Sequence, residues 1–237
     1  MDISTDTGLV DLSEKGLNKG NPISLDRRLF MKFTAFNGCN DVDQAISALD
    51  SCSCAVYLDI NNPRGLGIIS LAENPSDFID ILRPVFNREP FDKMQHIESF
   101  DMLGRTYSIG YESDLEEVLF NKPKDKISDP NNAWCVWYPL RREKKFYLLD
   151  QDKQKKILAE HGNLAKRYGF AGMATDIRLA CHGLDKNDND FIIGLLGPEL
   201  FPLSAVVQEM RLTEQTGNYL ESLGPFFIGK KIWSNIK

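Results

Sequence analysis

The sequence predicts an α+β fold made of two halves, each with the element order βαββαβ, which is the ferredoxin-like arrangement. Three observations support this prediction. Strand-like and helix-like apolar patterns alternate in the same order in both halves. The third strand and second helix have similar sequences in the two halves, GLGIISLAENPSDF at 65–78 and NDFIIGLLGPELF at 189–201. A polar, proline-containing linker at 121–133 separates the halves.

The first half, residues 26–120, contains the six elements of one ferredoxin-like unit. β-favouring runs predict strands, and amphipathic segments between polar turns predict helices. The order is a strand at 28–36, a helix at 41–51, strands at 54–60 and 65–72, a helix at 74–86 and a strand at 102–112.

The second half, residues 134–237, repeats the series. We expect strands at 133–140, 175–183, 190–197 and 224–232, and helices at 150–168 and 198–215. Pro198 suits the first turn of the last helix, where its missing N–H has no partner to lose. Two antiparallel sheets of this kind are expected to pack face to face into a barrel with the helices outside.

Composition limits the function classes. A net charge of −6, from 28 basic and 34 acidic residues, argues against a nucleic-acid-binding protein. No apolar run reaches the length of about 18 residues that a membrane span needs, and the acidic N-terminus lacks the features of a signal peptide. Residues 1–25 are interpreted as an arm, either poorly ordered or wrapped around another subunit. The five cysteines favour buried thiols in a reducing cytoplasm: Cys39, Cys52, Cys54, Cys135 and Cys181.

The run HGLDKNDNDF at 182–191 resembles a calcium loop because Asp185, Asn187 and Asn189 alternate. Such loops require a glycine at the sixth position and a glutamate at the twelfth. Here these positions are Asp190 and Leu196. Because β-favouring runs flank the segment, we predict a hairpin turn rather than a calcium site.

The helix at 150–168 places a histidine in its apolar stripe. Ile157, Leu158, Leu164, Ala165 and Tyr168 have the spacing of a buried helical face. His161 fills the gap in that stripe and is expected to face inward. Two interpretations stay open: a core histidine bonded to backbone, or a ligand of a metal or haem.

The strand TDIRLACH at 175–182 alternates between two faces. Asp176, Arg178 and His182 share the face opposite to the apolar one. That face either lies at the surface or lines a pocket for a polar or anionic ligand. His182 is also the alternative to His161 as a metal ligand.

The second half resembles the chlorite dismutase and coproheme decarboxylase family, haem-binding proteins of tandem ferredoxin-like fold. The resembling segments are WYPLRR at 137–142, AEHG at 159–162, HGLD at 182–185 and residues 206–229, with LGRTYSIG at 103–110 in the first half. The resemblance implies haem b or coproheme as the iron-containing group, peroxide or another small oxidant as co-substrate, and assembly into rings of five.

The same resemblance implies residue roles. His161 matches the histidine that binds the haem iron, and Tyr138 matches the tyrosine that forms a radical in the decarboxylases. Arg142 matches a basic residue that pairs with a propionate, and Arg105 is placed to reach another propionate.

The sequence also departs from the family pattern above the iron. Counting back seven residues from Gly183 reaches Asp176, and counting thirteen forward from His161 reaches Ala174. Neither is the arginine or glutamine found in the family. Arg178, two residues beyond Asp176 on the same face, either supplies the missing guanidinium or has no such role. Pro225 stands where the decarboxylases often have a serine near a propionate.

Two classes of function follow. The first is a haem-dependent oxidoreductase of haem biosynthesis, in which peroxide drives the conversion of two coproheme propionates to vinyl groups and carbon dioxide. Chlorite dismutation is less favoured, because it requires a positive group over the iron and Asp176 is negative. The second class is non-enzymatic: a haem carrier or sensor, or an oligomeric scaffold, since the fold alone does not determine function.

Overall fold

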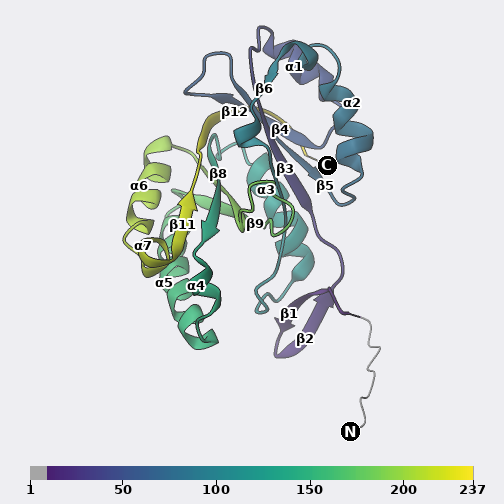
Figure 1. The fold of residues 1–237 in the computed structure, drawn as a ribbon. Coiled ribbons are helices and arrows are strands. Elements are labelled where there is room, and N and C mark those ends of the chain that lie inside the picture. The colour runs from purple at the N-terminus through teal and green to yellow at the C-terminus, as the bar shows by residue number, and fades with distance from the viewer. Residues whose placement is uncertain (1–9, 237) are drawn as a thin grey trace.

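The structure is a computed structural model that describes residues 10–236. Its helices and strands are mixed, as the α+β prediction requires, with strands through the centre and helices outside them (Figure 1). None of the helices within the described part of the chain is both long and apolar enough to cross a membrane.

The first half has the predicted elements in the predicted order. They are β3 (Phe30–Asn37), α1 (Val42–Ala48), β4 (Cys54–Asp59), β5 (Leu66–Ala72), a π-helical turn (Phe78–Leu82) continued by α2 (Arg83–Phe86), and β7 (Met102–Arg105). Their antiparallel pairing gives the strand order β7-β3-β5-β4. Two short 3₁₀ turns (Phe91–Lys93 and Glu98–Phe100) and β6 (Gln95–His96) precede β7, which is shorter than predicted.

The second half repeats this order. It contains β8 (Trp134–Arg142), α4 (Lys144–Tyr147), α5 (Gln151–Phe170), β9 (Thr175–Ala180), β10 (Phe191–Gly197), α6 (Leu200–Met210), α7 (Glu214–Tyr219), β11 (Leu220–Leu223) and β12 (Phe227–Asn235). The strand order is β12-β8-β10-β9, with β11 also on β8. The expectation for Pro198 was wrong: α6 begins at Leu200, and Pro202 occupies its first turn.

The two halves are joined at both edges of their sheets. β4 pairs with β12 from Asp59 opposite Gly229 to Cys54 opposite Asn235. β7 meets β9 at Arg105 opposite Ala180. The pairings run in the order β10-β9-β7-β3-β5-β4-β12-β8. Because β8 also pairs with β10, the last of these strands is hydrogen-bonded to the first.

The inner faces of all these strands share one apolar core. The ring of Phe33 lies 5.6 Å from that of Trp137 and 4.9 Å from that of Phe227, so residues from both halves interdigitate. Gly194 is required beside Trp137, because a Cβ atom there would lie 2.5 Å from the indole ring. The outer faces of the strands bear separate apolar clusters, one under α1 and α2 and one under α5 and α6.

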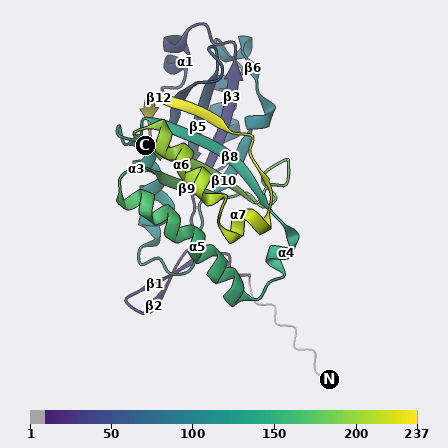
Figure 2. The same ribbon diagram turned by 90° about the vertical axis from the view of Figure 1, so that its left-hand side faces the viewer.

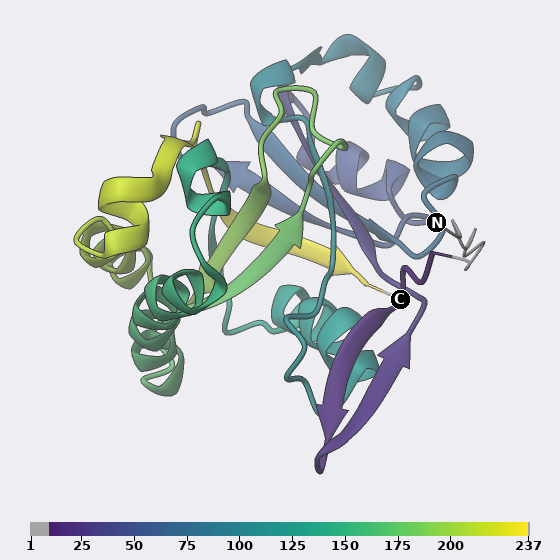
Figure 3. The ribbon, with the colours of Figure 1, turned by 60° about the horizontal axis from the view of Figure 1, so that its bottom comes forward.

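Residues 14–25, within the predicted arm, form a hairpin. β1 (Glu14–Asn18) pairs with β2 (Asn21–Leu25), and the hairpin projects beside α3 (Figure 3). The expectation of a poorly ordered arm is therefore wrong for these residues; residues 1–9 of the arm lie outside the described part. The hairpin is held by long-range hydrogen bonds that the sequence pattern does not reveal.

The segment predicted as the linker, 121–133, contains helix α3 (Lys122–Ser128), which follows a π-helical turn (Glu117–Asn121). Pro123 lies in the first turn of this helix, where proline is tolerated. Pro123 and Ile127 are buried, so tertiary packing stabilises a helix in a mostly polar segment. All five cysteine side chains are buried, as the sequence predicts.

Candidate functional site

Helices α5 and α6 cover the outer face of β8, β9 and β10 (Figure 2). The predicted residue His161 lies on α5, and Tyr138, Asp176 and Arg178 lie on β8 and β9. Helix α5 begins after Asp150, whose side chain caps it by accepting a hydrogen bond from the Lys153 N–H at 2.8 Å. It is 20 residues long and ends before Gly172, which has a positive φ of 66°.

Helix α5 is packed loosely for an element of this length. Of its residues, all of which lie in the described part of the chain, Ile157 alone is fully buried. Leu164 and Tyr168 are half-buried, and Leu158 is 37% exposed. The predicted stripe is therefore correct in direction but wrong in its depth of burial at Leu158. The helix is held from the side, because the Tyr168 hydroxyl donates to Glu209 on α6 at 2.6 Å. His161, Leu164 and Tyr168 on this helix are only half-buried.

His161 lies on this inward face, as the spacing predicts. Its Nδ1 is 3.3 Å from the Thr213 hydroxyl oxygen, and that hydroxyl donates its own proton to the Met210 carbonyl at 2.7 Å. Because a carbonyl cannot donate and the Thr213 contact with Met210 is the shorter one, this network favours the tautomer with the imidazole proton on Nδ1. Nε2 then carries a lone pair, which is the tautomer that a histidine needs for binding a metal through Nε2.

The electrostatic surroundings keep His161 neutral. Burial lowers its pKa from the usual 6.5 to about 4, and the positive charges of Arg178 and Arg142 act in the same direction. Asp176 opposes them. Four of the predicted site residues therefore lie close enough to interact: the helix supplies His161, and β8 and β9 supply the other three.

This pKa predicts a pH dependence of stability. The unfolded chain protonates His161 near pH 6.5 and the folded protein only near a pH of about 4, so the unfolded state binds more protons between these values. We expect the free energy of unfolding of the ligand-free protein to fall as the pH is lowered through this window. Urea denaturation checks this: His161→Gln should flatten the slope and His96→Gln, in the other half, should keep it. Equal slopes in all three proteins would contradict it.

Strand β9 alternates as predicted. Ile177, Leu179 and Cys181 are buried in the shared core. Arg178, on the opposite face, is paired through Nε with Asp176 at 3.1 Å, and 54% of its side-chain surface is exposed. Lys126 of α3 donates to the Asp176 carbonyl at 2.5 Å. This arrangement leaves a guanidinium on the sheet, facing the helix that carries His161.

Tyr138 lies on β8 with Val136 and Trp134 on the same outer face, as predicted. Its side chain is 8% exposed, and its ring centre lies 4.8 Å from that of Phe226, with the two rings tilted. Burial and, secondarily, the charge of Asp176 raise the pKa of the Tyr138 phenol well above its usual value. The hydroxyl is therefore protonated at neutral pH and lies on the same side of the sheet as Asp176.

Arg142, at the end of β8, lies between two aromatic rings. Its guanidinium carbon is 4.7 Å from the Phe146 ring centre and 4.5 Å from that of Phe191. The Nε atom is buried and has no hydrogen-bond partner among residues 10–236. A buried, unpaired N–H of a charged group is costly, and a carboxylate is the partner that a guanidinium fork fits best.

Two predicted residues are engaged elsewhere. Arg105 pairs with Glu14 of the N-terminal hairpin at 3.0 Å. His182 lies 3.3 Å from Asp190 through Nδ1, half exposed, and its ring meets Phe191 edge-on. His182 is thus beside the Arg142 stack. Within the described part of the chain, neither Arg105 nor His182 contacts His161.

Tyr107 lies beside the candidate site residues and was not singled out from the sequence. Its ring lies 5.7 Å from that of Phe191, on the same outer face. Burial raises the pKa of Tyr107, while the nearby charges of Arg178 and Arg142 lower it. The sequence feature that could have identified Tyr107 is its position in LGRTYSIG, a segment that resembles the family. It lies in the strand predicted at 102–112, beyond Arg105, the last residue of β7.

The run at 182–191 is a turn between β9 and β10, as predicted. The Asp185 carboxylate accepts hydrogen bonds from the Asn187 N–H at 2.7 Å and the Asn189 side-chain amide at 3.1 Å. Arg141 donates to the carbonyls of Asn187 and Asp188. The alternating Asp and Asn residues thus serve the turn itself.

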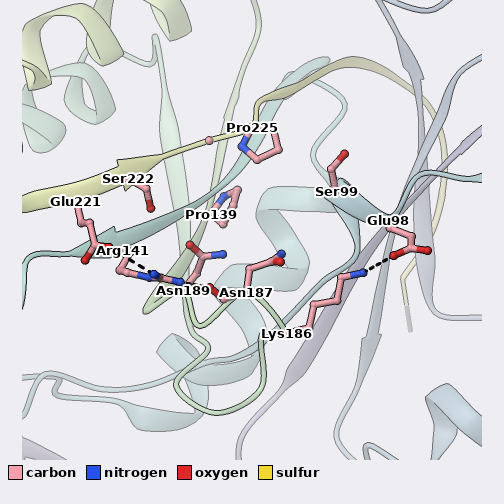
Figure 4. A pocket seen from close by; sticks show the side chains of 11 residues that line it. Glu98, Ser99, Pro139, Arg141, Lys186, Asn187, Asn189, Glu221, Ser222 and Pro225 are labelled. Carbon is pink, nitrogen blue, oxygen red and sulfur yellow. Dashed lines mark hydrogen bonds and ion pairs between the residues drawn. The ribbon is translucent and has the colours of Figure 1, made fainter.

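An open hollow of about 530 Å³ adjoins this turn (Figure 4). It lies beside Pro139 and Arg141, which alternate along β8 with Tyr138 and Arg142 and so point to the other face. Its Lys186 pairs with Glu98 at 2.9 Å, and its Arg141 lies 3.5 Å from Glu221. Since its charges are already matched, this hollow is separate from the His161 site.

Comparison with known proteins identifies the family and the fold. The family model described as chlorite dismutase matches residues 71–232. A coproheme decarboxylase from Mycolicibacterium smegmatis is 30% identical over 104 residues, which span 44% of this chain and 42% of that relative's length. The match to this relative therefore covers less than half of either protein.

Solved structures share the fold. A haem-binding protein from Thermus thermophilus matches with a TM-score of 0.66 and 16% identity, over 87% of this chain and 92% of that one. A chlorite dismutase from Candidatus Nitrospira defluvii, in complex with imidazole, matches with a TM-score of 0.68 and 14% identity, over 88% and 93%. Because the family match covers more than half of the chain and the fold agrees, this protein belongs to the chlorite dismutase family.

Proposed function

We propose that the protein binds an iron tetrapyrrole, coproheme or haem b, between α5 and the outer face of β8–β10, with His161 as the iron ligand. The observation that carries the proposal is the neutral, half-buried imidazole of His161, whose Nδ1 proton is held by Thr213 and which faces two arginines across the layer boundary. A neutral imidazole suits iron, and two guanidinium groups suit the carboxylates at the rim of such a macrocycle.

The residues present fit this group on three counts. The buried Nε of Arg142 lacks, within the described chain, a partner that a propionate would supply. The outer face of the strands offers an apolar floor that includes Val136, Ile193 and Leu195. On α5, Ile157 is fully buried, whereas His161 and Leu164 are only half-buried. We further propose that Arg178 supplies the guanidinium on the sheet side, in place of the expected residue at Ala174 or Asp176.

We propose peroxide-dependent decarboxylation of coproheme as the activity. When bound, the iron tetrapyrrole supplies the redox chemistry. The carboxylate of each reacting propionate would leave as carbon dioxide, and the two remaining carbons would become a vinyl group. This oxidation releases one proton and two electrons. One hydrogen peroxide would accept the two electrons together with two protons and form two waters. The chain's contribution is to hold the carboxylates with Arg142 and to place the Tyr138 phenol beside the reacting edge.

The finer fold assignment is also proposed: two ferredoxin-like units, residues 26–120 and 134–237, whose sheets form one barrel. The matching strand orders of the halves, and the return of the pairings from β8 to β10, support it. A cytoplasmic homopentamer, implied by the family resemblance, completes the proposal. Large apolar side chains available for an interface include Phe170, Phe201 and Leu212, which are at least 79% exposed.

The test is spectroscopic and then catalytic. Ferric coproheme and haem b are each added to the purified protein, and a shifted Soret band with saturable titration indicates a specific site. Peroxide is then added to the coproheme complex, and mass spectrometry follows the loss of carbon dioxide. Binding without conversion would favour a haem carrier or sensor. Oxygen release on adding chlorite would indicate dismutation instead, and no binding of either tetrapyrrole would contradict the proposal.

Arg142→Lys should weaken coproheme binding about tenfold, a loss of about 1.4 kcal/mol. Lysine keeps the charge but cannot form the fork or the stack between Phe146 and Phe191. Fluorescence quenching during coproheme titration measures the change. The matched control is Arg141→Lys, whose side chain points to the other face of β8 and should leave the affinity unchanged. Equal weakening by both variants would argue against Arg142 as a carboxylate ligand.

A further inference from the structure

The N-terminal hairpin contributes a nearly buried carboxylate to the first half of the protein. Glu14, on β1, has only 12% of its side-chain surface exposed. It pairs with Arg105 at 3.0 Å and accepts a hydrogen bond from the Ser108 N–H at 2.8 Å. Arg28 lies 3.8 Å away. Charge-assisted bonds of this kind are among the stronger ones, so Glu14 ties the hairpin to residues 105–108.

Backbone contacts extend this attachment along the segment after β7. The Ser108 hydroxyl donates to the Lys15 carbonyl at 2.7 Å, and the Leu17 N–H donates to the Glu112 carbonyl at 2.8 Å. Gly16 lies so close that a Cβ atom on it would stand 2.4 Å from the Glu112 carbonyl oxygen. The hairpin therefore holds residues 105–112, all of them described, which form no helix or strand beyond Arg105.

Tyr107 lies between two anchored neighbours in this segment. On one side, the Thr106 N–H donates to the Leu29 carbonyl at 2.9 Å. On the other side, Ser108 is held by Glu14. The Tyr107 ring packs on Phe191, which is one of the two rings around the Arg142 guanidinium. The nearby charges of Arg178 and Arg142 lower the pKa of Tyr107, against the larger effect of burial, which is consistent with this position.

We propose that the β1–β2 hairpin positions the carboxylate-binding edge of the tetrapyrrole site, with Glu14 as the positioning residue that holds Tyr107 against the Phe191–Arg142 stack. This inference rests on the proposed function and deepens it. Tyr107 and Arg142 both pack on Phe191, and a hydroxyl and a guanidinium are both donors that bind carboxylates. The hairpin therefore favours tetrapyrroles with more carboxylates, such as coproheme with four, over haem b with two. The chain thereby uses a segment remote in sequence to select its ligand.

The experiment compares affinities for the two tetrapyrroles in the whole chain. Glu14→Ala should weaken ferric coproheme binding about tenfold and haem b binding less, so the preference for coproheme falls. Glu14→Gln, which keeps an oxygen acceptor for the Ser108 N–H, should retain more of the preference. Asp11→Asn is the matched control, because it removes an exposed charge near the same hairpin that pairs with the exposed Lys15; it should change neither affinity.

Hydrogen exchange of the ligand-free protein provides a second readout. Glu14→Ala should accelerate exchange of the amides in 105–112 while circular dichroism shows that the fold persists. Faster exchange with equal weakening of both tetrapyrroles, or with no weakening, would overturn the inference and leave the proposed function intact. If Glu14→Ala does not fold, Glu14→Gln is tested in its place. A reduced preference for coproheme over haem b would support the inference, and an unchanged preference would overturn it. Failure of the unaltered protein to bind either tetrapyrrole would overturn both proposals.

Discussion

His161→Ala is expected to abolish the Soret shift that follows addition of ferric coproheme or haem b, or to weaken binding more than about 100-fold, which is about 2.7 kcal/mol. The reason is geometric. Within the described residues, His161 is the histidine that lies on the inward face of α5 and faces Arg178 and Arg142. Its Nδ1 is held by Thr213, so Nε2 is oriented and unprotonated before any ligand arrives.

The control for this variant is His182→Ala. His182 is paired with Asp190 and meets Phe191 edge-on, beside the Arg142 stack rather than on α5. Its replacement should leave the Soret band in place. Exogenous imidazole should restore a ligand-like spectrum to His161→Ala, because the substitution leaves space where the side chain stood. A normal spectrum for His161→Ala together with a lost band for His182→Ala would reverse the assignment.

Tyr138→Phe is expected to leave coproheme binding nearly unchanged and to reduce peroxide-driven decarboxylation by at least about 100-fold, equivalent to about 2.7 kcal/mol of activation free energy. The substitution removes only the hydroxyl, so the ring contact with Phe226 at 4.8 Å is preserved. If the phenol relays an electron and a proton from the reacting propionate, phenylalanine cannot replace it. Mass spectrometry of the tetrapyrrole after peroxide addition follows the mono- and divinyl products.

Tyr107→Phe is the matched comparison for Tyr138→Phe. Both variants lose one hydroxyl from a ring in the same outer-face cluster. Tyr107→Phe should affect affinity and preference between tetrapyrroles, whereas Tyr138→Phe should affect turnover. Normal turnover in Tyr138→Phe would exclude a radical role for that residue. Absence of turnover in the unaltered protein, with binding intact, would instead remove the decarboxylase assignment.

Local periodicity was sufficient to predict much of the architecture. The alternation in TDIRLACH correctly placed Ile177 and Leu179 in the core and Arg178 on the opposite face. The helical spacing around His161 correctly predicted its inward direction. These predictions succeed because the direction of each side chain within a strand or helix is set by backbone geometry that is already implicit in the sequence spacing. Loose packing of α5, by contrast, left Leu158 exposed where the stripe predicted burial.

The composition of the site was decided by tertiary structure. Glu14 meets Arg105 across a sequence separation of 91 residues, and Tyr107 meets Phe191 only because β7 and β9 are neighbours. The sequence alone predicted that His161 faces inward from its helix and that Arg178 lies on the face of its strand opposite the apolar one. Which strands become neighbours, and in what register, depends on the closure of long loops and on packing of a shared core. That is why the contacts of the hairpin with Arg105 and of Tyr107 with Phe191 became visible only in the folded protein.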